Sequence, residues 1–156
     1  HGDFGLNVTN SFTLKKYAEM GLVDATASFE MKLSQINRLG DMLPYGFIAY
    51  GRLPLMLTRN CPIKQAVGGC KNCTGGLTDR TGRFFPVKCD GTASEVLNSD
   101  VLVMSDRLSE ANCDFATLIF TDEAPERVKQ VCDCYEKRRK LDTDDITRGL
   151  YYRGII

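Results

Sequence analysis

The chain has 156 residues, of which 43% are hydrophobic, and its 20 Lys and Arg equal its 20 Asp and Glu in number. This length suits one compact core rather than two domains of ordinary size. The zero net charge argues against bulk affinity for nucleic acid or an anionic membrane, and no apolar run approaches the ~20 residues that cross a bilayer.

The first forty residues predict two strand–helix pairs. A strand over 6–9 leads into a helix over 12–20, in which apolar residues recur with a helical period. A second strand over 23–27 leads into a helix over 29–39, for which Ser28 is the expected N-cap. Each pair is therefore expected to form a βα unit.

A third strand, over 47–50, is followed by a Gly- and Cys-rich excursion from 59 to 89. Within it, residues 77–87 predict a β-hairpin with Gly82 at the turn, because a glycine tolerates the positive φ that a tight turn requires. The excursion interrupts the alternation of strands and helices, so we expect it to be an insertion.

After an apolar run over 101–104, the sequence returns to the earlier pattern. A fourth strand over 115–120 precedes a helix over 125–140, with Pro125 near the first helical position. The segment 147–154 that follows shows no periodicity.

Strands that alternate with helices predict a parallel sheet. We expect an α/β fold, half of a TIM-type (β/α)8 barrel, in a single domain over 1–156. Half a barrel leaves two open sheet edges, which proteins seldom tolerate, so a missing N-terminal half or a second copy of the chain is expected to complete it. A small doubly wound sheet is the alternative. The expected divisions are βα units over 1–58, the Cys-rich insertion over 59–100, the last βα unit over 101–140 and a tail over 141–156.

Four cysteines lie within the irregular excursion. They are Cys61, Cys70, Cys73 and Cys89, with a Cys-x-x-Cys pair at the centre and two Gly-Gly pairs beside it. Thiolates are soft ligands, and four of them suit either a tetrahedral zinc ion or an iron–sulfur cluster. Zinc ribbons usually carry two close pairs, so the single pair favours a cluster over zinc. One or two disulfides with spare thiols are the alternative.

The other three cysteines are assigned no ligand role. We expect Cys113 to pack as a small apolar residue, and Cys132 and Cys134 to point to different faces of the last helix. Seven cysteines is an odd number, whereas secreted disulfide scaffolds are usually shorter and have even counts. A reducing, cytoplasmic compartment is therefore expected.

The only histidine is His1, and this argues against a Ser-His-Asp or Cys-His nucleophilic site. In barrels, chemistry sits where strands end and loops begin. Glu30, Arg52 and Glu123 follow predicted strands and are the candidates for orienting a substrate or moving protons. Helix capping is the alternative role for such residues, and Glu30 suits the first turn of a helix.

Several short motifs follow one another along the chain. They are, in order, Asn7-Val-Thr-Asn-Ser11, Ser28-Phe-Glu30, Tyr50-Gly-Arg-Leu-Pro-Leu-Met56, Cys61-Pro62, Leu77-Thr-Asp-Arg80, Phe84-Phe-Pro-Val87, Leu97-Asn-Ser99 and Thr147-Arg-Gly-Leu-Tyr-Tyr-Arg-Gly154. Together they resemble the peptidase U32 family, also called collagenase-like proteases. The resemblance covers nearly the whole chain and implies the second half of that family's barrel domain, with the N-terminal half absent. The lack of an initiator Met and the early strand also lead us to expect a fragment or a processed piece.

The resemblance implies two activities. Some members are described as peptidases, with collagen as a substrate. Others act in oxygen-independent hydroxylation of RNA bases or ubiquinone precursors and carry a four-cysteine iron–sulfur cluster of the 4Fe–4S type, whose ligands would be expected where the four cysteines lie here. We therefore expect a cluster-bearing module of an enzyme that acts on RNA, a quinone precursor or a peptide, inactive as an isolated fragment. The alternatives are a peptidase, or a non-catalytic fragment, with structural zinc.

Overall fold

The computed structural model describes residues 1–153 and shows a mixed α/β chain that folds into two compact units. Unit 1 joins His1–Gly51 to the segment from Leu102 onward, and unit 2 is Arg52–Val101. A single domain with an insertion beginning at residue 59 was expected. The second unit begins earlier because the strand that directly follows residue 53 already pairs within it.

Unit 1 is organised around three parallel strands. These are β1 (Ala25–Thr26), β2 (Tyr45–Gly51) and β8 (Phe115–Leu118), and β2 pairs with both of the others. The prediction of parallel strands is therefore confirmed at these positions.

The predicted strand over 6–9 forms only in part. The backbone makes isolated parallel bridges to the β1 region at Gly2 and Val8. Between them lies a 3-10 turn, Phe4–Leu6, that ends at Asn7 with a left-handed φ of 51°. This turn stops a continuous ladder, although the segment still runs beside β1.

Unit 1 also contains antiparallel pairing, which the alternating pattern did not predict. Strand β7 (Val101–Val103) pairs antiparallel with the end of β2, and β9 (Ile146–Thr147) lies beyond β7 in the same sheet. The sheet of unit 1 is therefore mixed, and nothing in it identifies a half barrel specifically.

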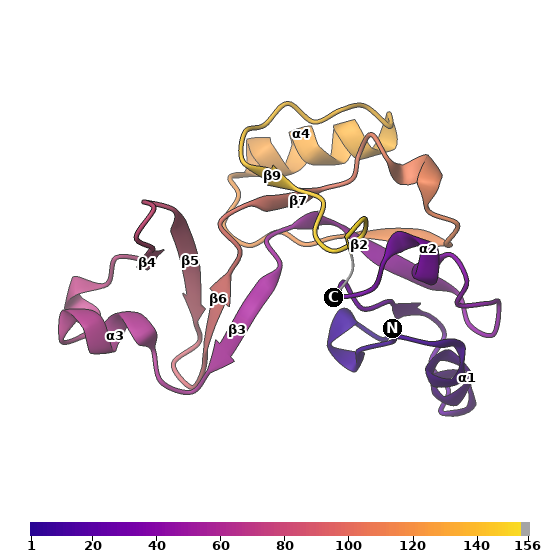
Figure 1. The fold of residues 1–156 in the computed structure, drawn as a ribbon, viewed down its shortest axis with the longest axis horizontal. Coiled ribbons are helices and arrows are strands. Elements are labelled where there is room, and N and C mark those ends of the chain that lie inside the picture. Colours follow the sequence, from indigo (N-terminus) through magenta and orange to yellow (C-terminus); the bar gives the residue numbers. More distant parts are fainter. Residues whose placement is uncertain (154–156) are drawn as a thin grey trace. The chain divides into compact units, whose positions relative to one another are not determined.

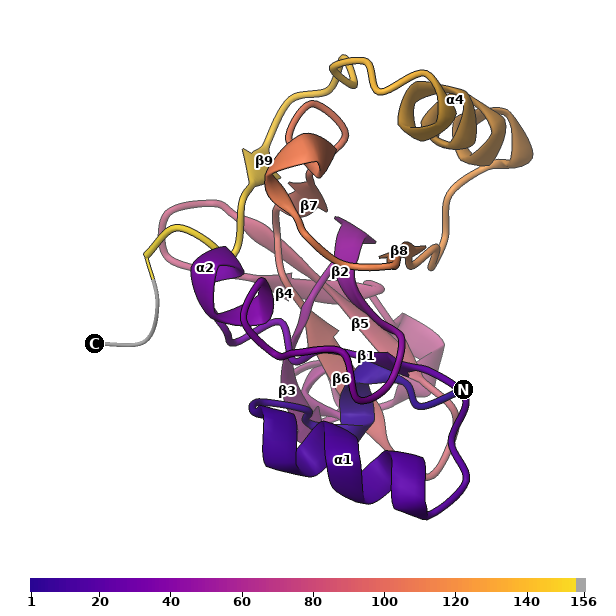
Figure 2. The ribbon, with the colours of Figure 1, turned by 90° about the vertical axis from the view of Figure 1, so that its right-hand side faces the viewer.

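Two of the predicted helices are confirmed in position, although the one predicted over 125–140 ends at Glu136. Helix α1 (Ser11–Glu19) is capped by Asn10, whose side chain accepts the Thr13 N–H at 2.9 Å. Helix α4 (Pro125–Glu136) begins with its proline at the first turn, where the missing N–H costs no hydrogen bond. Figures 1 and 2 show α1 and α4 at opposite ends of unit 1.

The helix predicted over 29–39 is wrong in length and in cap. Helix α2 spans only Leu33–Ile36, and its N-cap is Lys32. Ser28 is instead buried in the turn that follows β1, where its hydroxyl accepts the Glu30 N–H at 3.4 Å. The residues predicted to form the first turn of the helix form this non-helical turn instead.

The core of unit 1 is centred on β2, in which all seven residues are buried. Phe47 packs edge-on against Tyr151, with ring centroids 5.6 Å apart. The Tyr151 hydroxyl donates to the Ile48 carbonyl at 2.6 Å, and the Tyr135 hydroxyl donates to the Ala49 carbonyl. The tail and α4 therefore cover this strand and satisfy its polar groups.

Unit 2 is a four-stranded antiparallel sheet in the order β3-β6-β5-β4 (Figure 1). The predicted hairpin is confirmed, with Gly82 at φ 85° in its turn. Strands β3 and β6 and helix α3 were not predicted. The elements are β3 (Pro54–Thr58), α3 (Pro62–Val67), the 3-10 turn Cys70–Asn72, β4 (Gly76–Thr78), β5 (Phe84–Cys89) and β6 (Ser94–Leu97).

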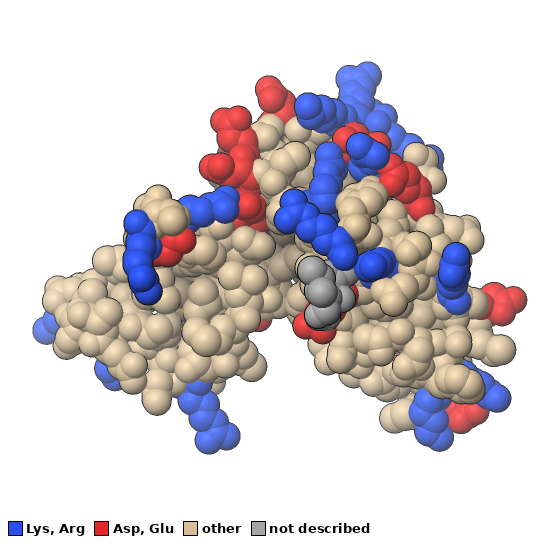
Figure 3. Space-filling view, viewed as in Figure 1, with Lys and Arg blue, Asp and Glu red and all other residues tan. Residues whose placement is uncertain are grey.

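No helix within residues 1–153 has the length and apolar character needed to span a bilayer. Lys and Arg side chains are interspersed with Asp and Glu in the region of α4 and the tail (Figure 3), which agrees with the zero formal charge of the chain.

Candidate metal centre

The first predicted ligand, Cys61, lies where β3 passes into α3. It is the N-cap residue of α3, with Pro62 in the first turn. The helix ends at Gly68, which takes a left-handed φ of 75° that a side chain would disfavour. The sequence Cys-Pro and the later glycine therefore fix both ends of this short helix.

The central Cys-x-x-Cys pair forms a compact turn. The backbone N–H of Cys73 donates to the Cys70 carbonyl at 3.2 Å and closes the 3-10 turn between them. Gly69 and Gly75 flank this turn with φ values of 155° and 74°. Glycine tolerates such positive φ values, so these two residues let the backbone bend on either side of the pair.

The fourth predicted ligand, Cys89, ends β5 and lies opposite Ser94 of β6. The turn between the two strands is held by Asp90, whose carboxylate accepts the backbone N–H groups of Thr92 and Ala93 at 2.8 Å. These hydrogen bonds lower the pKa of Asp90 to about 2, and the one from Ala93 has the largest effect.

Three of the four cysteines line one pocket of about 420 Å³ in unit 2. They are Cys61, Cys70 and Cys89, and the lining also contains Arg59 and Lys64. Cys73 does not line it. No Asp or Glu is among the residues that line this pocket.

Sharing a pocket is not the same as ligating one ion. Across residues 1–153, no three His, Cys, Asp or Glu side chains are grouped closely enough to hold a metal. All seven cysteines, each within the described part of the chain, are free thiols. Coordination would therefore require the cysteine-bearing loops to draw together, and the positive-φ glycines Gly68, Gly69 and Gly75 have open space around them.

Cys61 lies beside polar groups of α3 and β6. The backbone N–H of Lys64 is the main cause of a lowered pKa for its thiol, against the effect of desolvation. Ser94 is 1% exposed, and its Oγ is the one buried side-chain N or O atom in residues 1–153 without a hydrogen-bond partner. An unpartnered buried hydroxyl is unusual in a native fold.

The donor chemistry of this pocket fits a soft metal centre. Thiolates suit zinc and iron–sulfur clusters, whereas calcium and magnesium require oxygen ligands, chiefly carboxylates. Arg59 and Lys64 offset the negative charge that several thiolates bring.

Two of the three candidate catalytic residues have local side-chain partners. Arg52, in unit 2, donates to the carbonyls of Asn98 and Ser99, which gives it a structural role. Glu30 is exposed in the turn after β1, where its backbone N–H, and not its carboxylate, bonds to Ser28.

Glu123 stabilises the turn that follows β8. Its carboxylate accepts the backbone N–H groups of Thr121 at 2.6 Å and Asp122 at 3.2 Å. It also lies near the buried Tyr50, whose hydroxyl pKa is raised by burial first and by this carboxylate second. Glu123 therefore holds its own turn and is not a helix cap, because the N-cap of α4 is Ala124, which makes no side-chain capping hydrogen bond.

A polar network that sequence reasoning missed surrounds the single histidine. His1 Nδ1 contacts the Asp24 carboxylate, and His1 Nε2 lies 3.5 Å from the Thr26 hydroxyl. That hydroxyl also lies 3.2 Å from Thr117. The order Asp–His–Thr is that of a nucleophilic triad, but Thr26 is fully buried and its hydroxyl is closed to a substrate. Only the strand register, which no local pattern reveals, brings these residues together.

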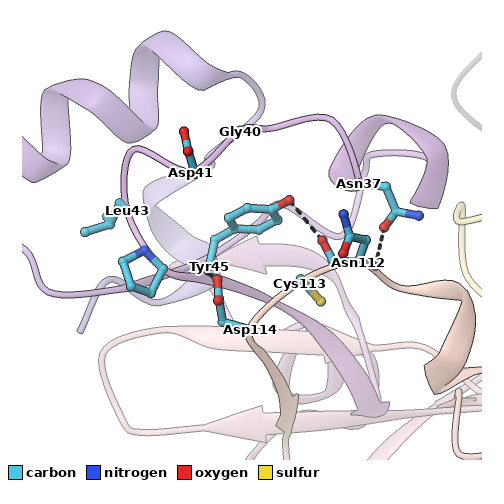
Figure 4. Close-up of a pocket in the computed structure, with 9 residues that line it drawn as sticks. Asn37, Gly40, Asp41, Leu43, Tyr45, Asn112, Cys113 and Asp114 are labelled. Atoms are coloured by element: carbon cyan, nitrogen blue, oxygen red, sulfur yellow. Dashed lines mark hydrogen bonds between the residues drawn. The ribbon is translucent and has the colours of Figure 1, made fainter.

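A second pocket, of about 460 Å³, lies in unit 1 where β2 and β8 begin (Figure 4). The Tyr45 hydroxyl donates to the Asn112 carbonyl at 3.1 Å, and Asn37 accepts the Asn112 N–H at 2.8 Å. Burial, followed by the charge of Asp114, raises the pKa of the Cys113 thiol to about 11. A thiol with this pKa is a poor nucleophile, so Cys113 has no ligand or catalytic character here.

Comparisons with family models, with curated proteins and with solved structures found no match to this chain.

Proposed function

We propose that unit 2 binds a metal centre through Cys61, Cys70, Cys73 and Cys89, an iron–sulfur cluster of the 4Fe–4S type ahead of a zinc ion. The observation that carries the proposal is the single pocket that three of these cysteines share. The fourth is tied to Cys70 by the closed Cys-x-x-Cys turn, so a small movement of that turn carries both sulfurs.

The residues of unit 2 would hold the centre in three ways. The four cysteines supply thiolates, and the Lys64 backbone N–H favours the thiolate form of Cys61. Arg59 and Lys64 compensate negative charge at the pocket wall. A bound iron–sulfur cluster supplies one-electron transfer, whereas a bound zinc ion would supply only a structural cross-link.

We further infer that this module belongs to a U32-type enzyme acting on RNA, a quinone precursor or a peptide, within the cytoplasm. The parallel series β1, β2, β8 in chain order is compatible with half of a barrel. The rest of the barrel would come from an N-terminal half or a second copy of the chain. Cluster chemistry ranks ahead of peptidase chemistry, because three of the cysteines share a pocket while Arg52 and Glu123 have local structural roles.

The proposal is tested on the full chain prepared without oxygen and reconstituted with iron and sulfide. The expected result is a brown protein that absorbs near ~400 nm, as thiolate–iron charge transfer does, with bound iron and sulfide by chemical analysis. Replacing any one of the four cysteines by serine is expected to reduce the iron content sharply. Cys134→Ser, on α4 and outside the pocket, is the matched control and should leave it unchanged.

The outcomes separate the two metals. A colourless protein with one zinc per chain and no iron would replace the cluster by structural zinc. A chain that binds neither metal, or that loses no metal when Cys61 and Cys89 are both replaced, would overturn the proposed centre.

A further inference from the structure

The central strand of unit 2 places one hydroxyl beside the cysteine pocket. Ser94 begins β6, and the register pairs it with Thr58 of β3 on one side and Cys89 of β5 on the other. Directly opposed residues of antiparallel strands have Cβ atoms ~5 Å apart and share a face of the sheet. Ser94 therefore lies beside one predicted ligand, and Thr58 begins the short connection that leads to Cys61.

The Ser94 hydroxyl has no role in the fold itself. Its side chain is buried, and its Oγ makes no hydrogen bond to any residue in 1–153. Buried hydroxyls are nearly always paired, so this one calls for a partner that forms in another state of the molecule. Ser94 and Cys61 line the same pocket, and the register sets Ser94 opposite Thr58, three residues before Cys61.

The burial of the Ser94 hydroxyl also determines whether it can act as a metal ligand or as a hydrogen-bond donor. Ser94 Oγ is sealed from solvent, so a metal bound in the pocket would meet the cysteine sulfur before it met this oxygen. A neutral alcohol is moreover a weaker ligand than a thiolate for a soft metal. Ser94 is therefore suited to donate to a ligand rather than to be one.

We propose that Ser94 is a positioning residue that donates a hydrogen bond to the Cys61 sulfur when that sulfur is a metal-bound thiolate. The inference rests on the four-cysteine centre proposed above. The hydrogen bond stabilises the charge on the sulfur and fixes its direction toward the pocket. Outer partners of metal ligands typically change metal affinity 10- to 100-fold, and hydrogen bonds to sulfur are among the factors that set cluster reduction potentials.

The test measures cobalt(II) affinity and cluster reduction potential in the full chain. Cobalt(II) takes the tetrahedral thiolate sites of zinc, and its sulfur-to-metal absorption reports binding directly. Ser94→Ala is expected to weaken cobalt binding about 10-fold and to lower the reduction potential of the reconstituted cluster. Ser99→Ala is the matched control, because that serine belongs to unit 2 but lies outside the pocket and bonds to Asp100.

A second pair of variants guards against a folding effect. Ser94→Thr and Ser94→Val have nearly the same shape and differ in the hydroxyl. The threonine variant is expected to bind cobalt more tightly than the valine variant by about 10-fold. Equal affinities and equal potentials in this pair would overturn the role of Ser94 while leaving the metal centre standing. Failure of the unaltered chain to bind either cobalt or iron would overturn both.

Discussion

The two units of this chain bury very different amounts of apolar side chain. In unit 1, every residue of β2 is buried, and aromatic side chains from α4 and the tail cover that strand. In unit 2, β3 exposes Leu55, Met56 and Leu57. The buried apolar residues described in unit 2 are only Leu53, Ile63, Val96 and Leu97.

The units also differ in how they treat buried polar groups. In unit 1, the buried Thr26 hydroxyl has a partner in Thr117, and the Ser105 hydroxyl accepts the Leu141 N–H at 3.2 Å. In unit 2, the buried Ser94 hydroxyl has none. A unit of about 50 residues with a thin core usually needs a disulfide or a metal to be stable. The comparison teaches that packing within unit 1 covers β2 and pairs these buried hydroxyls, whereas unit 2 has the thin core that the proposed metal centre would stabilise.

Metal removal is expected to have the largest effect, and to act on unit 2 alone. Structural metal sites can contribute on the order of 10 kcal/mol to folding. Stripping the reconstituted chain with a chelator should therefore abolish amide-exchange protection in β5 and β6 and leave it in β2. Hydrogen exchange read by mass spectrometry makes this comparison within one molecule. Unchanged protection in β6 after complete metal loss would break the distinction between the units.

A core truncation should have the opposite distribution. Phe47 is 1% exposed and packs on Tyr151, so Phe47→Ala removes a large buried side chain and leaves a cavity. We expect unit 1 to lose about 3–5 kcal/mol of unfolding free energy, measured by urea denaturation. Phe12→Ala is the matched control, since that ring is 83% exposed on α1 and should cost little. Similar losses for both variants would show that β2 is not the centre of the core.

A smaller effect is expected from one hydroxyl that ties the tail to β2. Tyr151→Phe removes the donor to the Ile48 carbonyl and leaves that buried oxygen unpaired. We expect a loss of about 1–3 kcal/mol from unit 1, seen as a lower unfolding temperature. Tyr152→Phe supplies the control, because its hydroxyl bonds to the exposed Glu110 and its loss should be nearly neutral. Equal shifts would show that the tail is not specifically anchored at Tyr151.

The sequence predicted the elements whose signals are local. Helix α1 has a capping Asn10, helix α4 has Pro125 in its first turn, and the hairpin has Gly82 at its turn. Strands β3 and β6 were missed because Pro54–Thr58 is largely exposed and non-alternating, and Ser94–Leu97 is four residues long. The helix predicted over 29–39 was too long. Its first apolar residues form the turn after β1, and only Leu33–Ile36 is helical.

The residues of the candidate site likewise differ in whether a local sequence signal marks them. The cysteine spacing and the flanking glycines could be recognised in the sequence, and three of those thiols share a pocket. Ser94 could not be recognised, because its importance comes from a strand register that sets it opposite Cys89. His1, Asp24 and Thr26 were missed for the same reason. Long-range pairing determines these clusters, and no local pattern encodes it.

The smallest expected effect concerns the acid that holds the β5–β6 turn. The pKa of Asp90 is lowered from 3.8 to about 2 by the backbone N–H groups of Ala93 and Thr92. Because the folded pKa is the lower one, the carboxylate contributes stability that is present above about pH 4 and is lost as the pH falls toward 2. Unit 2 should therefore weaken over this range, and NMR titration of the Asp90 carboxyl should give a midpoint near 2. Asp90→Asn keeps an acceptor oxygen but cannot titrate, so it should remove this part of the pH dependence. A carboxyl midpoint near 3.8 in the folded chain would show that the turn does not hold the ionised acid, and Cys89 and Ser94 would then lose the constraint that sets them opposite each other.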